Sequence, residues 1–154
     1  MKKLLGLAMV LSLVLTGVAF ALDTNTITVS ANVSGNCKFN TATSTLGFGA
    51  LDPNSSSDAS ASAMVTFWCT KGSGYSITDD DGLYETGVNL NRMRHAVDNA
   101  EFIPYTLTYN PASGTGTGKT VPITLNISGT IANANYVNAL AGDYGDTVVL
   151  TINP

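Results

Sequence analysis

The chain has 154 residues, of which 44% are hydrophobic and only 12% are charged. Its 11 acidic and 7 basic residues give a formal net charge of −4. Because an acidic surface repels phosphate groups, this balance argues against a nucleic-acid or anionic-lipid partner. Two cysteines and one histidine are too few ligands for a zinc centre, and nothing else in the composition calls for a cofactor.

The first 21 residues have the pattern of a secretory signal peptide. A basic start is followed by a Leu- and Val-rich stretch and by Ala19-Phe20-Ala21, which predicts cleavage after Ala21. The alternative is a membrane-spanning helix, but the apolar run is somewhat short and no basic cluster follows it. Residues 22–154 would then form an exported chain of 154 − 21 = 133 residues with a net charge of 5 − 11 = −6. This length predicts a single domain.

The next segment, TNTITVSANVSGNC, alternates apolar and polar residues in the manner of a half-buried strand. The apolar positions are Ile27, Val29, Ala31 and Val33, and the polar ones are Thr28, Ser30 and Asn32. This strand precedes the first cysteine and stands apart from the later pattern. The sequence leaves open which strand it pairs with.

Four further segments show the same alternation and predict an all-β sandwich. They are AMVTFWC, IPYTLTY, VPITLNISGTI and DTVVLTI. Turn-rich segments separate them, and only Asn135 to Leu140 could make a helical turn. Cys69 falls on the inward face of its strand. In an exported chain, Cys37 and Cys69 are expected to form a disulfide that closes a loop of about 30 residues, with two free thiols as the alternative.

The stretch SGTGTGKT, from residue 113, resembles a phosphate-binding loop. Ser113 stands where that motif needs its first glycine, and the β-patterned VPITLNI follows where a helix N-terminus would have to bind the phosphates. We therefore predict that no nucleotide binds here. The stretch is interpreted as a flexible hairpin loop.

Three other features suggest chemistry only weakly. The acidic run Asp79 to Asp81 lacks the spacing of an EF-hand, so an acidic turn is favoured, and a weak surface calcium site stays open. His95 has no second histidine and no evident nucleophile beside it, which predicts that the protein is not an enzyme. Trp68 lies in a strand, where packing is more common than a role as a sugar-binding platform.

Taken in order, several stretches resemble the spore coat U domain family, which includes the pilins of the archaic chaperone-usher pathway and relatives in bacterial spore coats. The stretches are ITVSANVSGNC, LGFGALDP, MVTFWCTKGSGYSI, RMRHAVDNAEFIPYTLTY, TVPITLNISGTI and GDYGDTVVLTI. The resemblance implies an incomplete immunoglobulin-like β-sandwich. Its open groove is filled by a donor strand from a neighbouring subunit, the donor-strand complementation that is a known form of β-augmentation.

Carried onto this chain, the resemblance implies a donor-strand extension at residues 22–34 and a pilin domain at residues 35–154. Ile27, Val29, Ala31 and Val33 would be the donor plugs, and Cys37 and Cys69 the disulfide. The implied partners are identical or related pilin subunits, a periplasmic chaperone and an outer-membrane usher, on a route to the cell surface, with roles in adhesion and biofilm formation. A spore or cell-surface coat protein and a monomeric glycan-binding module are the alternative functions.

Overall fold

The computed structural model describes residues 22–154, so the predicted signal peptide lies outside the described residues. Residues 33–154 form one compact unit, and residues 22–32 belong to a separate one. Among the described residues, every regular element is a strand apart from one 3-10 turn, and no helix is long and apolar enough to span a membrane. The elements are β1 Cys37–Phe39, β2 Ala59–Cys69, β3 Gly74–Asp79, β4 Arg92–His95, β5 Phe102–Pro104, β6 Thr106–Asn110, β7 Ser113–Thr115, β8 Ile123–Ile131, η1 Asn133–Asn135, β9 Tyr144–Gly145 and β10 Leu150–Asn153.

The first layer is an antiparallel sheet with the strand order β1-β2-β8-β6. Its two long central strands pair over their whole overlap, from Ala59 opposite Ile131 to Phe67 opposite Ile123. Because side chains alternate across a strand, the buried apolar residues of β2 and β8 point to one face, whereas Met64 and Trp68 of β2 lie on the other. Polar residues such as Ser128 cover the other face and are exposed.

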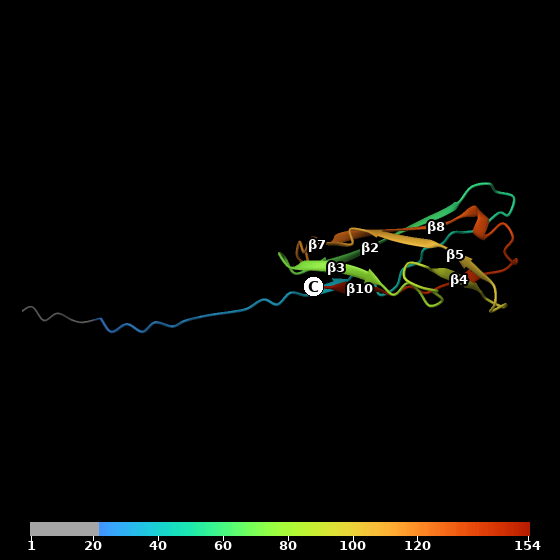
Figure 1. Ribbon diagram of the computed structural model, residues 1–154. Coiled ribbons are helices and arrows are strands. Elements are labelled where there is room, and N and C mark those ends of the chain that lie inside the picture. The colour runs from blue at the N-terminus through green and yellow to red at the C-terminus, as the bar shows by residue number, and fades with distance from the viewer. Residues whose placement is uncertain (1–21) are drawn as a thin grey trace, which may run out of the picture. The chain divides into compact units, whose positions relative to one another are not determined.

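The second layer consists of two smaller sheets, with the orders β10-β3-β7 and β5-β4-β9. Phe67 and Leu125 of the first layer pack with Tyr75 and Ile77 of β3, and the rings of Phe67 and Tyr75 lie 5.0 Å apart between centroids. Ile131 packs in a second cluster with residues of the other small sheet. The predicted all-β sandwich is confirmed, with β2 and β8 in one layer and β3 and β10 in the other (Figure 1).

The prediction of one continuous strand at IPYTLTY is wrong. The segment divides at Tyr105 into β5, which pairs with β4, and β6, which pairs with β8. The backbone N–H of Tyr105 donates to the carbonyl of Asn91 at 3.0 Å, which extends the β4–β5 pairing by one residue before the chain enters β6. The alternation of side chains continues through the break, so periodicity could not reveal that the chain changes layers there.

The hairpin predicted around SGTGTGKT is also wrong. β7 pairs with β3 in one layer, whereas β8 pairs with β2 and β6 in the other, so residues 116–122 cross between the layers. The crossing is held against the end of β2, because Gly118 N–H donates to the Cys69 carbonyl at 3.0 Å. The φ of Gly118 is 99°, a value that favours glycine. As the alternation predicted, a strand follows the loop.

Candidate functional site

A segment of the domain, residues 41–51, runs along the sandwich without joining either layer. Asn40 N–H still donates to the Thr66 carbonyl at 2.9 Å, but among the described residues no backbone hydrogen bond follows until Ser55. The segment is extended enough for Ser44, Leu46 and Phe48 to line the same cavity. Its backbone donors and acceptors are therefore free to pair with another strand.

The wall opposite this segment is formed by residues 144–150. It ends in β10, which lies at the edge of its sheet and pairs only with β3. No strand among the described residues pairs with the other edge of β10. Two backbone edges without strand partners thus border the same opening in the sandwich.

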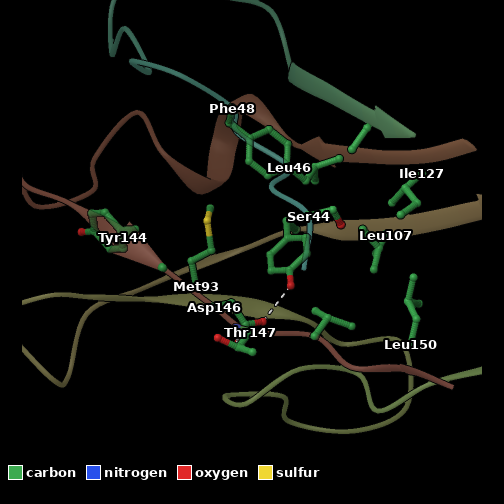
Figure 2. Close-up of a pocket in the computed structure, with 14 residues that line it drawn as sticks. Ser44, Leu46, Phe48, Met93, Leu107, Ile127, Tyr144, Asp146, Thr147 and Leu150 are labelled. Atoms are coloured by element: carbon green, nitrogen blue, oxygen red, sulfur yellow. Dashed lines mark hydrogen bonds between the residues drawn. The ribbon is translucent and has the colours of Figure 1, made fainter. Parts of the chain in front are cut away.

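The opening holds two adjoining cavities of about 310 and 600 Å³. Both are lined by Leu46, Phe48, Met93 and Tyr144, so they form one groove. Figure 2 shows Leu46 and Phe48 on one side of the first cavity and Thr147 and Leu150 on the other. The floor is largely apolar, with Leu107 and Ile127 from the four-stranded sheet. A groove of this kind suits apolar side chains spaced along an extended segment.

Gly129 of β8 makes room for one wall of the groove. A Cβ atom at this position would lie 2.7 Å from Leu46 Cδ2 and 2.7 Å from Phe48 Cζ. Gly129 interrupts the apolar stripe of β8 between Ile127 and Ile131, and the two side chains occupy that gap. Sequence reasoning missed this residue, although a glycine at an inward position of a strand signals that another part of the chain approaches closely.

One polar pair lies in the groove. The hydroxyl of Tyr105 donates to Asp146 Oδ2 at 2.7 Å, the interaction drawn as the dashed line that ends at Asp146 in Figure 2. Burial, and then the hydrogen bond to Asp146, raise the pKa of Tyr105 above its ordinary value of 10.0. The other oxygen of Asp146 accepts from the backbone N–H groups of Leu83 and Thr147. Asp146 therefore joins the floor, one wall and the β3–β4 loop.

The extension ahead of the domain carries the predicted plugs. Residues 22–36 form no strand and all are exposed, with exposed fractions of 79% for Ile27, 88% for Val29 and 81% for Val33. Ala31 is exposed as well. An alternating apolar stripe that remains in water is the pattern of a strand that lacks its partner.

The extension meets the domain beside the disulfide. Cys37 and Cys69 are bonded and lie opposite each other in the β1–β2 pair. Asn36 N–H donates to Thr70 Oγ1 at 3.0 Å, and Thr70 N–H donates to the Asn36 carbonyl at 2.8 Å. The bridge and these bonds fix the point at which the extension leaves the domain.

The model of the Spore Coat Protein U domain matches residues 23–151. The chain belongs to the spore coat protein U domain family. The family predicted from the sequence is thereby confirmed, and the match includes both the extension and the groove.

Two solved structures are similar to part of the chain at low sequence identity. One is a chain of the CsuC-CsuE chaperone-tip adhesion subunit pre-assembly complex from archaic chaperone-usher Csu pili of Acinetobacter baumannii, with 16% identity and a TM-score of 0.49. Another comes from a chaperone-tip adhesin complex of CFA/I fimbriae, with 15% identity and a TM-score of 0.47. Each match covers 78% of this chain but only 40% and 41% of the other chain. No curated protein matches the sequence significantly.

The carboxylates of Asp79 to Asp81, which suggested a calcium site, accept hydrogen bonds from backbone N–H groups in and around their own turn. Asp79 accepts from the N–H of Asp81, and Asp80 accepts from the N–H groups of Gly82 and Val149. Asp81 accepts from the N–H of Asn89 at 2.7 Å. Among residues 22–154, no group of three or more acidic, histidine or cysteine side chains is placed to share a metal ion. These contacts match the acidic turn that the sequence favoured.

His95 and Trp68 have structural contacts. His95 is buried, and its Nδ1 accepts from the backbone N–H groups of Val97 and Asp98 at 3.1 and 2.8 Å, which holds the loop after β4. Trp68 is partly buried on the outer face of β2, away from the groove. The ammonium of Lys119 lies 5.8 Å from its ring centroid. Trp68 therefore has a cation beside its ring, where a sugar platform would present an open face.

Proposed function

We propose that this protein is a structural, non-enzymatic subunit of an archaic chaperone-usher pilus that polymerises by donor-strand complementation. Residues 22–34 of one subunit would fill the groove of the next. One observation carries the proposal: the domain has a groove with an unpaired backbone edge on each side, and the same chain carries an exposed alternating stripe that fits such a groove. Membership of the spore coat protein U domain family supports it.

The energetics favour a firm and specific junction. An inserted strand would form hydrogen bonds with residues 41–51 on one side and with β10 on the other. Ile27, Val29 and Val33 would each contribute about 1.5 to 3 kcal/mol on burial. Ala31 would contribute less, because its side chain is small. Backbone pairing holds the strand, and the spacing of the plugs sets its register.

The proposed partners follow from the exposed groove. Before assembly, an apolar groove with unpaired edges is an aggregation hazard, so a periplasmic chaperone would have to cover it. An outer-membrane usher would then exchange the chaperone for the next subunit. The product would be a surface fibre with roles in adhesion and biofilm formation.

A coat protein is the second candidate, because the family is described by its spore coat members. It would use the same groove and the same extension, so the junction would be identical. The two differ in the final assembly, which is a thin fibre in one case and a continuous layer in the other. Electron microscopy of cells labelled for this protein distinguishes them.

A charge placed on the extension tests the junction. Val29→Asp would bury an unpaired carboxylate in the groove, at a cost of several kcal/mol, and should abolish fibres. Thr28→Asp is the matched control, because it places the same charge on the outward face of the same strand. Fibre yields are measured by shearing and immunoblotting. Equal yields from Val29→Asp and the wild type would rule out Val29 as a donor plug.

A further inference from the structure

Three lysines gather at one end of the domain, which we call the lysine end. Lys38 pairs across β1 and β2 with Trp68, and the Lys119 ammonium lies 5.8 Å from the same ring. Lys71 follows β2 in the turn beside Gly118. All three lysines are exposed, and no Asp or Glu occurs in residues 33–40, 64–78 or 110–124, which build this end. The lysine end is therefore a positive patch on an otherwise acidic protein.

The opposite end, which we call the acidic end, carries five exposed acidic side chains. These are Asp52, Asp58, Asp98, Glu101 and Asp143. Among residues 22–154, the one cation at the border of this end is half-buried Arg94, which pairs with Phe102 and Gly145 and lies over the Tyr84 ring. Hydrogen bonds tie its loops together, because Asn133 N–H donates to Asp58 Oδ1 and Ala96 N–H donates to the Asp143 carbonyl, both at 2.8 Å. No Lys or Arg occurs in residues 51–59, 95–102 or 132–145.

The length of β2 separates the two ends. Asp58 directly precedes this 11-residue strand, and Cys69, beside the lysine end, closes it. At about 3.3 Å per residue, the ends lie about 30 Å apart. This separation is several times the Debye length of about 8 Å at physiological salt. The opposite charges therefore do not neutralise each other within one subunit.

The two ends also lie where subunits would meet. Residues 34–36, from which the extension leaves the domain, bind Thr70 at the lysine end. The larger cavity of the groove is lined by Pro53 and Asp143 and so opens at the acidic end. A short connection through residues 33–36 would hold these surfaces of successive copies close together.

We propose that the lysine end of one copy docks on the acidic end of the next copy. This inference rests on the proposed function and adds a second contact to the donor-strand junction. The donor strand would enter the groove from the acidic end, since entry from the other end would bring two lysine ends together. Electrostatic complementarity of this kind speeds association and fixes orientation. A second copy is the favoured occupant because it carries the complementary charge, whereas the net charge of the protein repels nucleic acid and anionic lipid.

Carbodiimide cross-linking of isolated fibres tests the contact directly, because it joins only amines and carboxylates that touch. Mass spectrometry should find Lys38, Lys71 or Lys119 linked to residues of the acidic end, in species the size of two or more subunits. Fibres in which these lysines link only to Asp79–Asp81 or to Glu85, or to no carboxylate, would overturn this inference and leave the donor-strand proposal intact. If wild-type cells form no fibre or layer containing this protein, both proposals fail.

Charge reversal gives a second test. Replacing Lys38, Lys71 and Lys119 together by Glu should slow assembly about tenfold at low salt, because both surfaces would then be negative. Adding Asp98→Lys, Glu101→Lys and Asp143→Lys in the same chain should restore the rate, because the subunit ends would again be complementary. Ser62→Glu with Asn126→Glu is the control, since both positions are exposed in the middle of the sheet. Loss of assembly that the three added lysines do not restore would contradict the proposed contact between the two ends.

Tighter binding of the wild type than of the lysine variant to anionic vesicles, without any change in assembly, would assign the lysine end to a lipid surface instead.

Discussion

The hydroxyl of Tyr105 donates a 2.7 Å hydrogen bond to Asp146, and this pair links the floor of the groove to one of its walls. Tyr105 lies at the break between β5 and β6, while Asp146 follows β9. Because Asp146 also accepts from the backbone of Leu83, a single carboxylate sets the position of three segments. The hydrogen bond of one tyrosine therefore helps to fix the separation of the floor and the wall of the groove.

The first prediction concerns high pH. Burial and Asp146 raise the pKa of Tyr105, and burial, followed by a hydrogen bond to Asp79, raises the pKa of Tyr109 to about 12. Folded-state pKa values above the unfolded value of about 10 mean that the folded state binds these protons more tightly. The contribution of these two tyrosines to the unfolding free energy is fully present below about pH 10 and is lost as the pH rises through their folded-state pKa values. Denaturant titrations at a series of pH values should show a constant unfolding free energy from pH 7 to 9 and a decline above about pH 10.

Tyr105→Phe is the control for this decline. It should lower stability at neutral pH by about 1 kcal/mol through loss of the hydrogen bond. It should also make the fall in unfolding free energy above about pH 10 shallower, since one of the tyrosines with a raised pKa no longer titrates. An unchanged slope in this variant would show that other groups cause the loss.

The second prediction concerns Gly129. Gly129→Val would place side-chain atoms where Leu46 and Phe48 now lie, so it should displace that wall and narrow the groove. We expect a loss of stability of about 1 to 3 kcal/mol and a large loss of fibres. Ser128→Val, at the neighbouring outward position, is the matched control and should assemble normally. Thermal unfolding and the fibre yield, normalised to the periplasmic subunit, provide the measurement.

The third prediction concerns the disulfide between Cys37 and Cys69. The exported protein should be about 2 Da lighter than its dithiol form, because one bridge forms with loss of two hydrogens. Replacing both cysteines by Ser should lower the free energy of unfolding by about 2 to 5 kcal/mol. Intact-mass spectrometry and denaturant titration check the two statements. Two alkylatable thiols in the exported protein would contradict both.

The fourth prediction distinguishes the role of the extension, which donates a strand, from the role of the groove, which accepts one. Deleting residues 22–34 removes no strand and leaves the groove intact, so the variant should still fold with its chaperone and accept a donor. Expressed alone it should form no fibres. Expressed with the wild type it should occupy only the first position of a fibre, because it can accept an extension but cannot donate one to a growing fibre, a result visible by immunogold electron microscopy. Gly129→Val provides the contrast, because a subunit with a narrowed groove can donate its extension but not accept the next one, so it should end growing fibres and shorten them. Fibres of full length with the deleted subunit as the only copy would refute the role of the extension.

The sequence by itself determined the class of fold and the family. Alternation along β2 and β8 predicted two half-buried strands, because the period of two is a local property of each strand. The same local pattern marked the extension, where Ile27 and Val29 alternate with polar residues. In the structure the extension forms no strand. The order of motifs along the chain was enough to identify the family that the match over residues 23–151 confirms.

Only the tertiary structure decided which strands share a sheet and where the groove lies. IPYTLTY and SGTGTGKT each connect two layers, and hydrophobic periodicity does not distinguish a continuous strand or a hairpin from a crossing between sheets. Gly129 beneath Phe48, and Tyr105 beside Asp146, are pairs of residues 81 and 41 positions apart in the chain. Their roles arise from packing between distant segments, and no local pattern records such contacts. The groove exists because residues 41–51 pair with no strand and β10 pairs with a strand on one edge only, a property of the assembled sheets that no single segment carries.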